Sequence, residues 1–302
     1  LTFLSIYNYQ VNNSNSNSSK INTIGDDTKI IQMAKDYSTV PLLMISALSP
    51  TGESDISFLY EILLDTELQD QILDEILEII RLKGYMGVNM LISHITAYNQ
   101  RLYLNIIEKM SSKLREGGYI YMITLSPDPS ILESLDLQSI SYLVDRIIFL
   151  QNIWTKQIEP PGPVSNISLI KPFVDHLIQY VSPQIISLGK PLIGYDWIIP
   201  FVEGSKASLL SLNSTLFLAY EQGVVINFDE VSQTPFFNYY RPTVGVSEEH
   251  QVWFIDARSI RALDDLIIEY DLMGTGIWNI TSYNQQLFSI TNGTYNIDKL
   301  LN

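Results

Sequence analysis

The sequence GYMGVNMLIS at residues 84–93 places an apolar strand directly after an amphipathic helix. In the preceding segment, 58–83, apolar side chains recur at helical spacing, at Ile72, Leu73, Ile76, Leu77 and Ile80. Gly84 stands where a glycine commonly ends a helix, because it adopts a left-handed backbone at little cost. The spacing therefore predicts one helix over 58–83, a turn at Gly84 and a buried strand over 85–92.

Strands and helices alternate in the same way on both sides of this stretch. Before it, apolar runs predict strands at 1–7 and 40–46, with a helix at 27–35 between them, and the Asn- and Ser-rich residues 12–20 predict a surface loop. After it, a helix is marked by Leu102, Ile106, Met110 and Leu114 and ends at Gly117 and Gly118. Further strands are expected at 119–125, 146–150 and 185–193, and further helices at 135–144 and 172–180. This alternation indicates an α/β protein with a parallel sheet, most economically a (β/α)8 TIM barrel.

The alternation is interrupted between residues 200 and 251. A helix at 208–222 is followed by a strand-like run at 224–228 and by the aromatic sequence FFNYY at 236–240. We therefore expect a small α+β insertion domain over 200–251, with the barrel formed by 1–199 and 252–302. Barrel periodicity is expected to resume at 252–255, with a helix at 259–270 and a last strand at 276–280. The barrel strands then number seven, beginning near residues 3, 41, 86, 119, 146, 186 and 276, one short of closure.

Composition excludes several classes of function. The 302 residues are 46% hydrophobic, and 18 basic against 33 acidic side chains give a net charge of −15, which disfavours nucleic acid as a partner. The chain has no cysteine, so thiol catalysis, Cys-ligated zinc and disulfides are excluded. The three histidines, His94, His176 and His250, are too scattered to predict a metal site. No apolar run approaches the roughly 20 residues of a membrane span, and no cofactor is implied.

Several windows resemble glycoside hydrolase family 18 in its spore cortex-lytic, YaaH-like and SleL-like branch. GYMGVNMLIS is similar to the fourth-strand signature GYDGVNIDFE of that branch. Other similar windows, in the same order and spacing, are PPGPVS at 160–165, IGYDWIIPF at 193–201, INFDEVSQTPFFNY at 226–239, HQVWFIDARSI at 250–260 and the strand at 276–278. The resemblance implies a chitinase-like (β/α)8 barrel with a small insertion before the last strand, and it implies that the first strand would precede Leu1 and is missing from this chain.

The catalytic motif of that family is degenerate here. By resemblance, the acetamide group of the substrate attacks the anomeric carbon, a Glu protonates the leaving oxygen and an Asp two residues earlier orients the acetamide. The matching positions hold Ser93 for the Glu, Leu91 for that Asp and Met86 for the outer Asp, whereas Asn89 matches an Asn of the branch. A serine hydroxyl is far too weak an acid to replace the Glu, and loss of a general acid costs on the order of 10²- to 10⁴-fold.

Two other positions have changed in the same direction. Asn152 stands where the family has a Tyr that supports the intermediate, and Ile255 replaces a Glu in VWFIDARS. The scaffold residues are retained, including Gly87, Val88, Trp253, Asp256 and Arg258, and the last two are expected to form a structural salt bridge. By resemblance, the retained residues expected to contact a glycan are Trp278, Tyr195, Asp196, Trp197 and Trp154. For Trp278, simple barrel packing is an equally good interpretation.

These observations favour a catalytically inactive family 18 protein. It is expected to bind a glycan containing N-acetylglucosamine, peptidoglycan or chitin-like, or to act as a scaffold for a spore or cell-wall protein, in a bacterial spore, cell wall or extracellular setting. The alternative is an active N-acetylglucosaminidase with a relocated acid, for instance Asp196 or Glu203. A barrel mouth plugged by Leu91, Met86 and Leu150 would favour the pure scaffold, whereas an open, aromatic-lined mouth would favour glycan binding.

Overall fold

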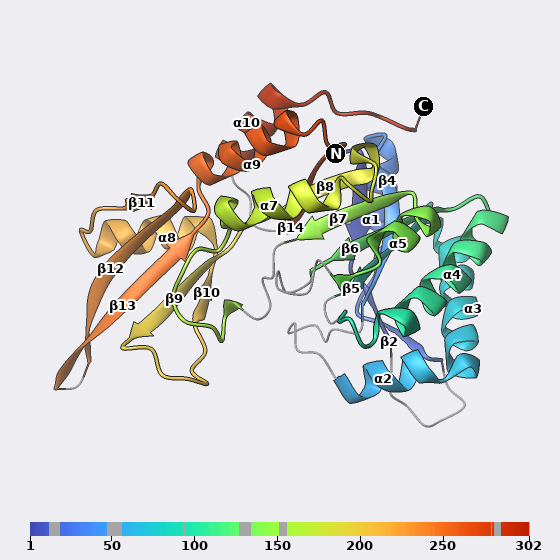
Figure 1. The fold of residues 1–302 in the computed structure, drawn as a ribbon, viewed down its shortest axis with the longest axis horizontal. Helices are drawn as coiled ribbons and strands as arrows, with labels where there is room; N and C mark the ends of the chain where they lie inside the picture. The colour runs from blue at the N-terminus through green and yellow to red at the C-terminus, as the bar shows by residue number, and fades with distance from the viewer. Residues whose placement is uncertain are drawn as a thin grey trace. The chain divides into compact units, whose positions relative to one another are not determined.

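The computed structural model describes residues 1–11, 19–46, 56–92, 95–126, 134–150, 156–243, 245–278, 280 and 285–301. Its contacts divide the chain into two compact units. Unit 1 comprises Leu1–Pro127, Glu133–Ile147 and Asn296–Asn302, and unit 2 comprises Asp128–Leu132 and Ile148–Tyr295. Figure 1 colours the chain from blue at the N-terminus to red at the C-terminus.

Unit 1 is a layer of parallel strands with helices packed beside it. The strands are β1 (Phe3–Ile6), β4 (Val40–Ser46), β5 (Gly87–Ile92), β6 (Ile120–Leu125) and the first residues of β7 (Arg146–Leu150). Parallel pairing joins β1 to β4, β4 to β5 and β5 to β6. The helices are α1 (Thr28–Asp36), α2 (Ile56–Leu64), α3 (Thr66–Lys83), α4 (Gln100–Glu116) and α5 (Leu137–Leu143), and α3 and α4 lie next to each other (Figure 1). A short antiparallel hairpin of β2 (Tyr9–Val11) and β3 (Ile21–Thr23) completes the unit.

The single helix expected over 58–83 is in fact two helices. Asp65 separates α2 from α3, and its carboxylate accepts hydrogen bonds from the backbone N–H groups of Glu67 at 2.9 Å and Leu68 at 3.0 Å. This satisfies donors that a helix start leaves free, so Asp65 begins a new helix although the apolar spacing continues through it. The expected end of the helix is confirmed, because Gly84 has a φ of 77° in the left-handed region.

Unit 2 contributes the other parallel strands and their helices. The parallel pair is β8 (Ile186–Pro191) with β14 (Gly274–Trp278), and the helices are α7 (Ile167–Leu177), α9 (Ala257–Glu269) and α10 (Gln285–Thr294). A 3₁₀ turn at Pro183–Ile185 precedes β8. Helix α7 begins five residues before the expected start at 172, because the Asn166 side chain accepts the backbone N–H of Ser168 at 3.1 Å and caps the helix there.

Seven strands form the sheet of the β/α fold, in the order β1-β4-β5-β6-β7-β8-β14. Their starting residues lie within two residues of the seven positions expected from the sequence, and the α/β barrel-type fold class is confirmed. Helices alternate with these strands along the chain, and antiparallel elements intervene twice: the hairpin of β2 and β3 between β1 and β4, and the second sheet between β8 and β14.

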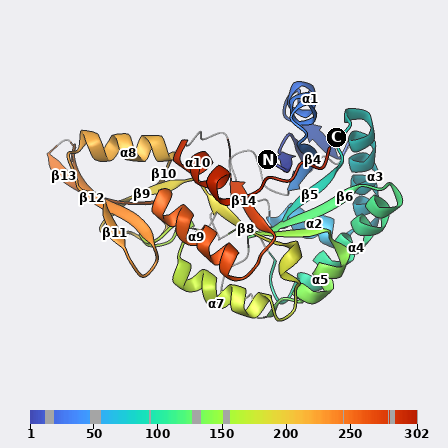
Figure 2. The ribbon, with the colours of Figure 1, turned by 90° about the horizontal axis from the view of Figure 1, so that it is seen from above.

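The second sheet of unit 2 is antiparallel and has five strands in the order β10-β9-β13-β12-β11. These are β9 (Gly194–Ile199), β10 (Ser208–Leu210), β11 (Asn227–Asp229), β12 (Thr234–Thr243) and β13 (Val246–Phe254), with helix α8 (Leu212–Glu221) before β11. The α8 helix packs on β13, as the view in Figure 2 shows.

This sheet extends past both ends of the segment 200–251. Strand β9 begins at Gly194, and Val252 of β13 pairs with Asp196. The expectation that 252–255 resumes the barrel pattern is therefore wrong, because residues 252–254 are already hydrogen-bonded to β9 in an antiparallel ladder.

Candidate functional site

Residues 87–92 of the signature motif form β5, which is buried along its whole length. Residues two apart on a strand share a face, so Asn89 and Leu91 point the same way. The Asn89 amide donates to Ser5 Oγ at 2.9 Å and accepts from Thr124 Oγ1 at 3.0 Å. Leu91 is 5% exposed. On this face of β5 the motif therefore presents the apolar side chain of Leu91 and an Asn89 amide that is already hydrogen-bonded.

Of the other positions that the resemblance matched to the family's catalytic residues, the structure describes Met86. Met86 precedes β5 and is half-buried, and its backbone bonds to Pro41 and Ile120 on the neighbouring strands. Ser93, Asn152 and Trp154 lie outside the described residues.

Trp278 is the last residue of β14, at the carboxyl end of the strand. It pairs with Pro191 of β8, and its carbonyl accepts the backbone N–H of Leu192 at 2.6 Å. The residue is half-buried, so part of its surface remains open to solvent. Carboxyl ends of barrel strands are where proteins of this architecture bind their ligands.

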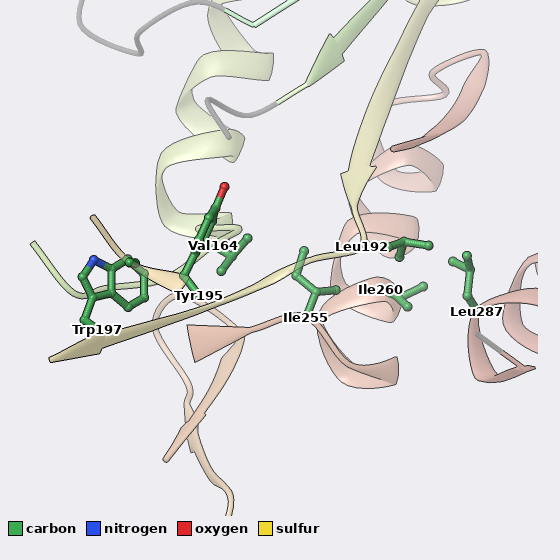
Figure 3. Packing of buried hydrophobic residues seen from close by; sticks show 8 residues of the cluster. Val164, Leu192, Tyr195, Trp197, Ile255, Ile260 and Leu287 are labelled. Carbon is green, nitrogen blue, oxygen red and sulfur yellow. The ribbon is translucent and has the colours of Figure 1, made fainter. Parts of the chain in front are cut away.

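Tyr195 and Trp197 lie on one face of β9 and are 2% and 1% exposed. Their ring centroids are 5.5 Å apart, and the Trp197 indole N–H donates to the Glu159 carbonyl at 2.9 Å. Figure 3 shows both rings in a cluster with Val164 and Ile255. Burial raises the pKa of the Tyr195 hydroxyl above its ordinary range. In this packing the two rings stabilise the sheet and present no open ring face.

Asp196 points to the opposite face of β9, into a buried polar cluster. Its carboxylate accepts the Tyr239 hydroxyl at 2.7 Å and lies 2.9 Å from His250 Nδ1. The Tyr239 and His250 rings are stacked with centroids 4.6 Å apart. Burial and the hydrogen bond to Asp196 both raise the pKa of Tyr239. The first candidate for a relocated acid is therefore engaged within the sheet, whereas the second, Glu203, lies exposed in the segment after β9.

The expected pair of Asp256 and Arg258 is confirmed as a structural ion pair. Asp256 caps α9 by accepting the backbone N–H of Arg258 at 2.8 Å, and it also accepts the guanidinium Nη2 at 2.7 Å. The guanidinium carbon lies 4.2 Å from the centre of the Phe228 ring. The neighbouring Ile255 is 2% exposed and belongs to the apolar cluster of unit 2.

Sequence reasoning missed a row of side chains on the antiparallel sheet. Phe236 and Trp253 are directly paired and stacked, with centroids 4.6 Å apart, and the next pair along the two strands is Asn238 with Gln251. The available signal was the period of two in FFNYY and HQVWF, which places every second residue on one face. That signal becomes informative only when the pairing between the two strands is known.

The described residues contain no group of three or more His, Asp or Glu side chains that could hold a metal ion. None of the helices in the described part of the chain combines the length and the apolar character needed to cross a bilayer.

No protein-family model matches the sequence. Among curated proteins, it is 26% identical over 282 residues to the putative sporulation-specific glycosylase YdhD of Bacillus subtilis, covering 92% of this chain and 65% of that one. It is 28% identical over 262 residues to the cortical fragment-lytic enzyme of Bacillus anthracis, covering 84% and 60%. The chain therefore spans less than two thirds of the length of these relatives.

Solved structures agree with the sequence matches. The spore cortex-lytic enzyme SleL of Bacillus cereus superposes with a TM-score of 0.86 at 25% identity, over 99% of this chain and 69% of that one. A chitinase from Chromobacterium violaceum superposes with a TM-score of 0.81 at 18% identity, over 95% and 89%, which shows the shared fold alone. The chain is therefore similar in sequence and fold to spore cortex-lytic glycosylases of the SleL type, and similar in fold to a chitinase.

Proposed function

We propose that this chain is a non-catalytic family 18 protein that binds a glycan containing N-acetylglucosamine, peptidoglycan or chitin-like, in a spore or cell-wall setting. Its relatives are named for sporulation and for the spore cortex, which supports a glycan partner and a spore or cell-wall location. The observation that carries the loss of catalysis is Leu91, a buried apolar residue at the position of the acetamide-orienting carboxylate.

Substrate-assisted hydrolysis requires two groups that this chain lacks at the matching positions. One is an acid that protonates the leaving oxygen, and position 93 holds a serine, whose hydroxyl cannot do so near neutral pH. The other is a carboxylate that holds the acetamide for attack, and Leu91 offers no hydrogen bond. Asn89, on the same face, already bonds to Ser5 and Thr124. A bound acetamide would therefore be neither oriented nor activated.

Binding can persist when chemistry is lost, because the two depend on different residues. Trp278 retains partial exposure at the carboxyl end of β14, and we propose that its indole is the platform on which the apolar face of a sugar stacks. Tyr195 and Trp197 support this role indirectly, by holding β9 in place through their burial. Asp196 anchors the other face of that strand through Tyr239 and His250. Trp154 completes the proposed set of glycan-binding residues.

The test measures hydrolysis and binding on the same preparation. The chain is incubated with peptidoglycan from purified spores and with N-acetylglucosamine hexamer, and soluble fragments are detected by mass spectrometry. A double variant, Leu91→Asp with Ser93→Glu, is run alongside to restore the missing acids. Binding of the hexamer is measured by calorimetry for the parent, for Trp278→Ala and for Phe217→Ala, a control that removes a 60% exposed ring on α8.

We expect no fragments from the parent and hexamer binding that Trp278→Ala weakens and Phe217→Ala leaves unchanged. Fragment release by the parent would overturn the loss of catalysis, and Asp196→Asn and Glu203→Gln variants would then identify the acid. Absence of glycan binding by the parent would overturn the binding proposal and favour a scaffold for a spore or cell-wall protein.

A further inference from the structure

One face of the antiparallel sheet in unit 2 is built from aligned rows of aromatic and amide side chains. The register of β12, β13 and β9 places Phe236 opposite Trp253, and Trp253 opposite Tyr195. The next row along the same face is Asn238, Gln251 and Trp197. Residues directly opposite each other in paired strands point to the same side, so these six side chains form one surface.

This surface is covered on one side and open on the other. Tyr195 and Trp197 on β9 are buried beneath residues that include Val164. On β12 and β13, Asn238 is exposed, and Phe236, Trp253 and Gln251 are half-buried. The open part therefore presents stacked aromatic rings and amides to solvent. Packing of an apolar core does not explain why these rings and amides lie at the surface.

The polar groups on the open part are connected in a chain with a fixed direction. The Trp253 indole N–H donates to Gln251 Oε1 at 3.1 Å, and the Gln251 amide donates to Asn238 Oδ1 at 3.2 Å. The Asn238 amide then donates to Glu249 Oε1 at 3.2 Å. The carboxylate can only accept, so it sets the orientation of both amides. Each amide nitrogen still has a second N–H, and each amide oxygen has a second lone pair, held in place before any ligand arrives.

We propose that the open part of this face is a binding surface for an uncharged, N-acetylated oligosaccharide. Its residues are Phe236, Trp253, Gln251, Asn238 and Glu249. The stacked rings offer an apolar platform to the C–H face of a sugar, and the fixed amides pair with acetamide and hydroxyl groups. Glu249 and the net charge of −15 disfavour anionic ligands such as nucleic acid or phosphorylated polymers. The choice of ligand class rests on the proposed function. None of these five residues belongs to the set on which that function depends, although Tyr195 and Trp197 of that set adjoin them on β9.

The experiment follows the Trp253 indole N–H directly by NMR, with its signal assigned from a Trp253→Phe variant. N-acetylglucosamine hexamer is the probe, and cellohexaose, which has the same linkage without acetamide groups, is the ligand control. Calorimetry on Asn238→Ala and Gln251→Ala measures affinity, and Phe217→Ala serves as the control for loss of a surface side chain. Thermal unfolding of each variant checks that the sheet remains folded.

We expect the Trp253 signal to move with the hexamer and not with cellohexaose, and each amide variant to bind the hexamer about 2- to 10-fold more weakly, as expected for loss of one hydrogen bond. A hexamer that binds and shifts Trp278 while Trp253 and both amide variants are unaffected would overturn this inference and leave the proposed function intact. A hexamer that shifts neither tryptophan and shows no heat of binding would overturn both.

Discussion

Replacing Asp27 by Asn should remove a pH-dependent part of the stability of unit 1. The Asp27 side chain is 1% exposed and accepts the hydroxyls of Tyr9 at 2.8 Å and Tyr85 at 2.6 Å, and it pairs with Lys83 at 3.0 Å. Burial alone would raise its pKa, but the hydrogen bonds from Tyr85, Lys83 and Tyr9 outweigh burial and lower the pKa to about 2. Against an ordinary value of 3.8, this corresponds to about 2 kcal/mol of folding free energy.

The sign follows from the direction of the pKa change. The folded protein holds Asp27 ionised more firmly than the unfolded chain does, so the stabilisation is complete above about pH 5 and is lost as the pH falls through about 2. The free energy of unfolding is measured in urea at pH 7, 4 and 2.5. At pH 7 it should be about 2 kcal/mol lower for Asp27→Asn than for the parent, and this difference should become smaller toward pH 2.5. The neighbouring Asp26→Asn is the control, because that side chain is 79% exposed and should matter less. This reasoning would be refuted by a loss of unfolding free energy that is independent of pH, or that is equal in Asp27→Asn and Asp26→Asn.

Lys190→Met should destabilise unit 2 by about 3–5 kcal/mol in urea unfolding, because it leaves the fully buried Asp264 carboxylate without its ion-pair partner. Adding Asp264→Leu should recover most of that loss, and a double variant no more stable than the single one would contradict this account. Gly87→Ala should destabilise unit 1 by about 1–3 kcal/mol or more, since the new methyl carbon would lie 2.1 Å from the Ile120 carbonyl oxygen. Gly293→Ala, with no neighbour within 4 Å, should leave the unfolding midpoint unchanged or slightly higher, and equal losses in both alanine variants would argue against steric crowding at Gly87.

The two faces of β9 show why the sequence of this strand can be retained for structural reasons alone. One face packs Tyr195 and Trp197 into the apolar cluster of unit 2, and the other ties Asp196 to Tyr239 and His250. Both sets of contacts stabilise the antiparallel sheet whether or not a glycan is hydrolysed. Packing alone is therefore a sufficient reason to retain IGYDWIIPF, which agrees with the proposed loss of catalysis.

Local patterns were sufficient for most of the parallel fold. The strand at 40–46 begins and ends where its largely apolar run does, because a strand buried on both faces must be mostly apolar. The strand at 146–150 also has the expected bounds. The break at Asp65 was missed because capping competes with apolar spacing, and the spacing alone continues through that residue. The start of α7 was missed for the same reason at Asn166.

The chemistry available at positions 91 and 93 is determined by the sequence itself. Whether a side chain can protonate an oxygen depends on its own functional group, so Leu91 and Ser93 decide this wherever the strand lies. Only the tertiary structure brings together the proposed binding surface, which consists of Phe236, Asn238, Glu249, Gln251 and Trp253. Its members come from strands joined by antiparallel pairing, and a shift of one residue in that register would turn half of them to the opposite face. Register depends on contacts between distant segments, and no single segment of the sequence encodes it.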